Sequence, residues 1–345
     1  MSREVKLALA AFVALALSCL VGGTCLIAAG LLGASTAEPG PGTGEGPPSP
    51  ALPSGLQPSV ILEGERQTWG GYVYVVPPGM TAAAAPDGLL LQRTGQDACT
   101  IVLLPLRPAE GALEAQALDL LTRFFAAKYS GYRDPYGGSA PLQFQRKGTT
   151  GSGRAFVELP GLTPLDAQGQ TVDGLVRALA LRVGEQVAGV IGIEGPGRGL
   201  DEGADHGHRW LRLLYSLDFP GAPAAARDAS PDVVGTWLSA SASGAVSETY
   251  AADGRFLSGA GFRTTRDVGP TTIEEKTTTW AGEGTWEVHG DLLTVRRAGG
   301  KVETNWFRVY SEPNASTPSG WLTTLSKLER SLVDSSVYEI GLRKQ

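Results

Sequence analysis

The stretch GTWEVHGDLLTVR, residues 284–296, contains two runs of alternating apolar and polar residues around the turn His289-Gly290-Asp291. Alternation with a period of two places successive side chains on opposite faces of a strand, so two such runs around a glycine turn indicate an antiparallel hairpin. Asp253-Gly254 joins the runs 246–250 and 255–257 in the same way. The C-terminal third of the chain is therefore predicted to consist of β-hairpins.

Further strands are predicted to complete a sheet in this part of the chain. Gly235-Thr236-Trp237 begins one of them, and others follow at residues 305–310, 320–325 and 337–343. About eight antiparallel strands are enough to close a small barrel. The sequence thus predicts an all-β barrel over residues 232–345.

Residues 59–220 mix strand and helix signals. Runs rich in β-branched and aromatic residues indicate strands at 71–76, 88–93 and 99–106. Apolar residues recur every three or four positions over residues 112–129, which predicts an amphipathic helix. Further strands are predicted at 142–147, 154–159, 175–183 and 186–193, and a closing helix at 205–217. This order predicts an α+β domain with helices packed on an antiparallel sheet.

A set of motifs in residues 66–220 suggests a family for this domain. The motifs are Trp69, the strand end Val75-Val76-Pro77-Pro78-Gly79-Met80, the segment Ile101-Val-Leu-Leu-Pro105 and the closing Leu214-Tyr-Ser-Leu-Asp-Phe219. With them the region resembles the PsbP-like family, which includes the DcrB-type bacterial envelope proteins. The resemblance implies a PsbP-like fold and an adaptor or assembly factor, and it supplies no catalytic motif.

Residues 230–345 carry a second set of motifs. Gly235-x-Trp237 is followed by Tyr250-x-x-Asp253-Gly254-Arg255-Phe256. With this pattern the region resembles the lipocalin-like domains of bacterial envelope proteins. The resemblance implies that Trp237 closes one end of the barrel, so its role is structural.

The N-terminal segment, residues 1–35, predicts export. Arg3 and Lys6 precede an uncharged apolar run over residues 7–32, and positive flanks stay on the cytoplasmic side of a membrane. The run exceeds the ~20 residues that span a bilayer, which favours a retained transmembrane anchor. Cleavage after Ala37 and lipidation of Cys19, as in a bacterial lipoprotein signal, stay open as alternatives. The bulk of the chain is expected to be extracytoplasmic, in the periplasm or at the cell surface.

Two linkers are expected to separate the parts of the chain. Residues 36–58 are rich in Pro and Gly and predict an extended spacer. Residues 221–231 are rich in Pro and Ala and offer little apolar surface. The regions 59–220 and 232–345 are therefore expected to have separate cores and to behave independently.

The charge and cysteine content exclude several classes of function. The chain of 345 residues has a net charge of -6, and acidic residues outnumber basic ones in both folded regions, so a nucleic-acid partner is not expected. Cys19 and Cys25 lie in the apolar segment, which leaves Cys99 alone in the folded part. An internal disulfide and a cysteine zinc site are not expected there, and Cys99 is predicted to be a core residue.

No group of residues predicts a catalytic, cofactor or metal site. His206 and His208 lie near carboxylates, but no third ligand is identifiable, and Gly195-Pro-Gly197-Arg-Gly199 lacks the spacing of a phosphate loop. The pair Glu274-Glu275 is interpreted as a solvated loop or edge strand. The tryptophans that could line a ligand cavity are predicted to pack the core instead; they include Trp280, Trp286, Trp306 and Trp321.

The functional expectation is a membrane-tethered, non-catalytic binding or assembly module of the bacterial envelope. Its partners would be the membrane, through the N-terminal segment, and an extracytoplasmic protein of unknown identity. A carrier of a small apolar ligand in the C-terminal barrel is the alternative, and an unrecognised hydrolase is a third hypothesis.

Overall fold

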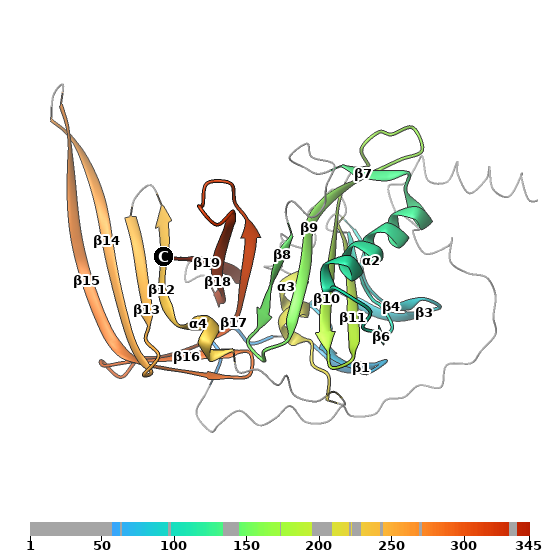
Figure 1. The fold of residues 1–345 in the computed structure, drawn as a ribbon, viewed down its shortest axis with the longest axis horizontal. Helices are drawn as coiled ribbons and strands as arrows, with labels where there is room; N and C mark the ends of the chain where they lie inside the picture. Colours follow the sequence, from blue (N-terminus) through green and yellow to red (C-terminus); the bar gives the residue numbers. More distant parts are fainter. Residues whose placement is uncertain are drawn as a thin grey trace, which may run out of the picture.

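A computed structural model describes residues 57–62, 64–95, 98–133, 145–172, 174–194, 209–220, 222, 229–241, 244–268, 271–330 and 337–345. Within these residues the protein is mostly β-structure with few helices (Figure 1). No helix among them is long and apolar enough to cross a membrane. The predicted anchor or signal at residues 7–32 and the spacer up to residue 56 lie outside the described part.

The N-terminal part of the described chain alternates strands with two helices. In chain order these elements are β1 (Arg66–Trp69), β2 (Tyr72–Val75), β3 (Thr81–Ala85), β4 (Gly88–Arg93), β5 (Cys99–Leu103), β6 (Arg107–Pro108), α2 (Leu113–Lys128), β7 (Gly131–Arg133), β8 (Arg146–Thr150), β9 (Ala155–Leu165), β10 (Leu175–Val183), β11 (Gln186–Glu194) and α3 (Arg209–Ser216).

An antiparallel sheet with the strand order β3-β4-β5-β11-β10-β9-β8 organises this part. Its central hairpin, β10–β11, turns at Gly184-Glu185 as predicted. Gly184 adopts φ +59, a left-handed conformation that glycine tolerates without strain in a two-residue turn. Both faces of these strands are buried, which explains why they read as nearly continuous apolar runs.

Each face of this sheet has its own helix (Figure 1). The predicted amphipathic helix is confirmed as α2, which buries Ala117, Leu120 and Leu121 against β9, β10 and β11. On the other face, α3 buries Trp210 and Leu213 together with residues of β2 and β4. The predicted start of α3 at residue 205 falls outside the described residues.

The C-terminal part is a closed antiparallel barrel of eight strands, which confirms the predicted barrel. After the short helix α4 (Ser230–Val233) come β12 (Gly235–Ser241), β13 (Gly244–Tyr250), β14 (Arg255–Val268), β15 (Thr271–His289), β16 (Leu292–Arg297), β17 (Val302–Pro313), β18 (Trp321–Arg330) and β19 (Val337–Lys344). Each strand pairs with the next, and β19 pairs with β12 to close the ring.

The sheet and the barrel are joined by a strand pairing that the sequence does not reveal. β8 pairs with β17 from Thr150 opposite Arg308 to Lys147 opposite Ser311, on the edge of β17 that lies beyond the end of β16. Tyr310 and Leu328 of the barrel also belong to the apolar core that α3 covers. The expectation of two separate cores is therefore wrong. It rests on the composition of the linker, which does not indicate that the open edge of β8 pairs with a strand of the barrel. The boundaries 59–220, 221–231 and 232–345 stay a prediction.

Candidate functional site

One end of the barrel interior is filled by aromatic side chains. Trp237, Tyr250, Phe256 and Trp286 pack together there, and α4 contributes Val233 to the same cluster. The Trp237 side chain is fully buried, and its indole N–H donates to the carbonyl of Val233 at 2.7 Å. This confirms the prediction that Trp237 is a core residue.

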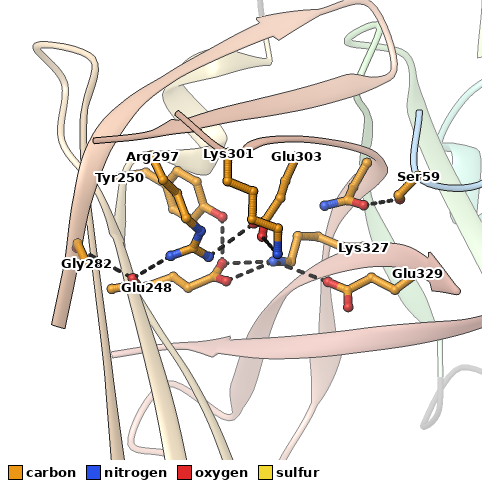
Figure 2. A network of polar contacts seen from close by, with 11 residues as sticks. Ser59, Glu248, Tyr250, Gly282, Arg297, Lys301, Glu303, Lys327 and Glu329 are labelled. Atoms are coloured by element: carbon orange, nitrogen blue, oxygen red, sulfur yellow. Dashed lines mark hydrogen bonds and ion pairs between the residues drawn. The ribbon is translucent and has the colours of Figure 1, made fainter. Parts of the chain in front are cut away.

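A charged layer, formed by Glu248, Arg297, Glu303, Lys327 and Glu329, lies beside these aromatic residues (Figure 2). Lys327 Nζ donates to the two carboxylate oxygens of Glu248 at 2.9 and 3.0 Å and lies 3.6 Å from Glu329 Oε1. Arg297 Nη2 donates to Glu303 Oε2 at 3.1 Å. Each charge named here thus lies next to a charge of opposite sign.

The strand register explains why these charged residues point into the barrel. Glu248 lies opposite Trp237, and Lys327 lies opposite Phe307. Partners directly opposite each other in an antiparallel sheet share a face, and both Trp237 and Phe307 belong to the barrel core. Glu248 and Lys327 are accordingly buried, with 7% and 6% of their surface exposed.

Burial and neighbouring charges shift the pKa values of Tyr250 and Glu303 in this layer. Burial, followed by the charge of Glu248, raises the pKa of Tyr250 well above its usual value, and the Tyr250 hydroxyl donates to Glu248 Oε2 at 2.6 Å. Burial alone would raise the pKa of Glu303, but hydrogen bonds from Lys301 and Arg297 outweigh it and lower that pKa. At neutral pH the tyrosine is therefore a proton donor and Glu303 is an anion.

The contacts of the charged layer hold strands of the barrel together. A general base or acid needs a pKa near the working pH, and neither Tyr250 nor Glu303 has one. The Lys327 ammonium is engaged by Glu248 through two hydrogen bonds. A buried polar group without a partner is costly, so these contacts fix the position of β13 relative to β18.

A second buried group of charges spans β8, the strand that lies between β9 and β17. Arg308 Nη1 is 2.9 Å from Glu158 Oε2, and the Trp210 indole N–H donates to Glu158 Oε1 at 2.8 Å. Burial alone would raise the pKa of Glu158, but the guanidinium groups of Arg308 and Arg146 and the Trp210 N–H outweigh it and hold the pKa at about 2. Glu158 is an anion over most of the pH range and ties the sheet to the barrel.

A third contact between sheet and barrel comes from the turn His289-Gly290-Asp291. Asp291 Oδ1 accepts a hydrogen bond from the Ser152 backbone N–H at 2.7 Å, and burial raises the pKa of Asp291. A small cavity of about 30 Å³ adjoins it, with Arg154 and Arg308 in its wall. A cavity of this size holds a water molecule and no larger ligand.

An open cleft of about 430 Å³ lies on the opposite face of the sheet, between α2 and β6. Leu104, Leu120 and Val187 are among its apolar lining residues. Charged residues of both signs also line it, namely Arg107, Glu110, Asp119 and Arg123. The side-chain nitrogen of Gln116, another lining residue, is buried and has no hydrogen-bond partner among the described residues. Small-molecule and peptide sites commonly have this size and this mixture of apolar and polar lining.

The residues singled out from the sequence lie apart in the structure. Cys99 is buried in the sheet core, as predicted. His289 is half-buried, and its Nε2 lies 3.2 Å from Glu287 Oε2. Glu274-Glu275 lies in β15, paired with β14. Within the described part of the chain, no group of three or more His, Cys, Asp and Glu could hold a metal ion.

The predicted tryptophan packing is confirmed for two residues. Trp286 belongs to the barrel core, and Trp306 packs against the core of the sheet. Trp321 is half-buried, and Lys147 Nζ lies 4.3 Å above its ring, so its packing in a core stays a prediction. The side chain of Trp280 lies outside the described part, as do Cys19, Cys25, His206, His208 and the segment 195–199.

Sequence reasoning missed the buried charges Glu158, Glu248, Arg308 and Lys327. One available signal was a charged residue at an inward position of an alternating strand, as in Phe156-x-Glu158. Such a signal identifies a buried charge but not its partner, because Glu158 and Arg308 are separated by 150 positions.

No protein-family model, curated protein or solved structure matches the chain.

Proposed function

We propose that the protein is a membrane-tethered, non-catalytic binding or assembly module of the bacterial envelope, with a PsbP-like region before a lipocalin-like barrel. The N-terminal apolar segment would hold it in the membrane, and the described part would be extracytoplasmic. The strand and helix order of the first region and the closed barrel of the second are compatible with these two resemblances.

The observation that carries this proposal is the continuous sheet that runs from β3 through β8 into β17. The buried Glu158–Arg308 pair reinforces this junction. A partner that binds either part therefore meets a body with fixed geometry. Fixed presentation of surfaces is what an assembly module requires, since flexible parts lose entropy on binding.

The cleft between α2 and β6 is the surface that we assign to an extracytoplasmic protein partner. It lies on the face of the sheet opposite to α3. An acceptor group of the partner would satisfy the Gln116 nitrogen, and an apolar side chain would cover Leu104 and Leu120.

The contents of the barrel favour this function over transport of an apolar ligand. The described interior contains packed aromatic side chains at one end and paired charges next to them. An apolar ligand would gain little from contact with this charged surface, because it offers no polar partner to the charges that it would bury, and burial of unpaired charges is costly.

Site-specific photo-crosslinking in the native membrane tests the proposal. A photoreactive residue replaces Arg123, whose side chain is 65% exposed at the cleft, and a control replaces Arg255, 72% exposed on the barrel. We expect one discrete protein adduct from position 123 and none from position 255. Ala115→Arg should block the adduct by filling the cleft, whereas Ala126→Arg, an exposed control on α2, should leave it unchanged. Equal background labelling at both positions would contradict the assignment.

A further inference from the structure

The wall of the barrel is incomplete between β17 and β18. The pairing of these two strands ends at Phe307 opposite Lys327, after which residues 328–330 pair with β19 alone among the described residues. Residues 302–306 of β17 continue alongside β16. The edge of β17 that faces β18 is therefore left without its strand partner along this stretch.

The direction of the backbone groups shows which edge is open. The N–H of Phe307 donates to the carbonyl of Asp291, at the start of β16. Backbone groups of successive residues in a strand point to opposite edges, so the carbonyl of Thr304, three residues earlier, points away from β16. Thr304 thus presents an acceptor to the gap between β17 and β18.

The first described residues of the chain occupy this gap. The Ser59 N–H donates to the Thr304 carbonyl at 2.7 Å, and the Ser59 hydroxyl donates to Asn305 Oδ1 (Figure 2). The Trp306 indole N–H donates to the Val60 carbonyl at 3.0 Å. The Val60 side chain is fully buried in the core of the sheet. Ser59 and Val60 are therefore held by the barrel and by the sheet at once.

The gap leads to the charged layer. Glu303 and Asn305 alternate with Thr304 and share a face of β17 with Phe307, which lies in the barrel core. Lys327, opposite Phe307, is the last residue of β18 that pairs with β17. Its side chain is only 8% exposed although it lies next to an opening in the strand ladder.

We propose that residues 59–60 form a strap that closes a lateral opening in the barrel and shields Lys327 of the charged layer from solvent. Release of the strap frees the Thr304 carbonyl and lets water reach Lys327. This inference does not depend on the proposed function.

Lysine footprinting of the full-length chain in detergent tests the strap. Ser59→Pro removes the N–H that binds Thr304, and Gln57→Pro is the matched control, because Gln57 is exposed and lies just outside the strap. Brief treatment with an amine-acylating reagent is followed by mass spectrometry. Loss of these hydrogen bonds should raise the modification of Lys327 about tenfold through local opening. Gln57→Pro should leave it at the wild-type level.

Two internal reporters separate opening of the strap from unfolding. Lys301, with a side chain 72% exposed, should react equally in all variants, and the buried Cys99 should stay unreactive towards a maleimide. Trp306→Phe, which removes the donor to Val60 and keeps an aromatic ring, provides a second variant if Ser59→Pro does not fold. The proposal is overturned if Lys327 stays protected in the folded variants, or if Lys327 and Cys99 always become reactive together.

Discussion

The buried pair Glu158–Arg308 offers the sharpest test of the junction between sheet and barrel. A tenfold change in acidity corresponds to about 1.4 kcal/mol, so lowering the Glu158 pKa from 4.5 to about 2 corresponds to about 3 kcal/mol of stability. Removal of one partner of a buried ion pair typically costs a similar ~3–5 kcal/mol. Glu158→Gln should therefore lower the free energy of unfolding by about 3 kcal/mol at pH 7.

The pH dependence provides an independent check of the same effect. Because the folded-state pKa of Glu158 is lowered, its contribution is complete above the unfolded pKa of 4.5 and is lost as the pH falls towards about 2. Wild-type residues 57–345 should lose this stability across that window, whereas Glu158→Gln should not.

Urea unfolding followed by tryptophan fluorescence at pH 7 and at several lower pH values measures both quantities. Asp253→Asn, which removes an exposed ion pair with Arg255, serves as the control and should change the midpoint little. A double-mutant cycle with Arg308→Met isolates the contribution of the pair. Equal midpoints for wild type and Glu158→Gln at pH 7 would refute the reasoning.

Three further predictions concern the junction and the core. Gly148→Ala should weaken the β8–β17 pairing, because its Cβ would lie 1.9 Å from the Val309 carbonyl oxygen. Gly299→Ala, which has open space around its Cβ, should leave this pairing unchanged. Hydrogen exchange of the β17 amides distinguishes the two variants. A chain cleaved within residues 223–228 should elute from size exclusion as one complex, and separated fragments would contradict the shared sheet. Trp237→Ala should destabilise the barrel by ~3–5 kcal/mol, measured by thermal unfolding, and a retained melting temperature would argue against its role in the core.

The sequence predicts elements whose signals are local. The alternation over 284–296 identifies β16 and the last part of β15, which begins earlier, at Thr271. Gly184-Glu185 identifies the β10–β11 turn, because strand faces and turn conformations depend on adjacent residues. The periodicity over 112–129 identifies α2 within one residue at each end. Trp237 and Cys99 are assigned to cores from the apolar character of their surroundings.

Local signals fail where strands change partners. The third strand of the first region is predicted to run to residue 106, but β5 ends at Leu103 and the chain resumes as β6 after a break. The predicted strand at 142–147 is observed as β8, Arg146–Thr150, which pairs with both β9 and β17. A partner distant in the sequence decides where such a strand begins and ends.

The sequence by itself determined the hairpins, the main helix of the sheet and the barrel, since each depends on composition or on a short period. Only the tertiary structure decided that β8 joins the barrel, that Glu158 meets Arg308, that Glu248 meets Lys327 and that Ser59 closes the gap beside β17. The physical reason is that hydrogen bonds and ion pairs form between neighbours in space. Residues 59 and 304 become neighbours only after the chain between them has folded.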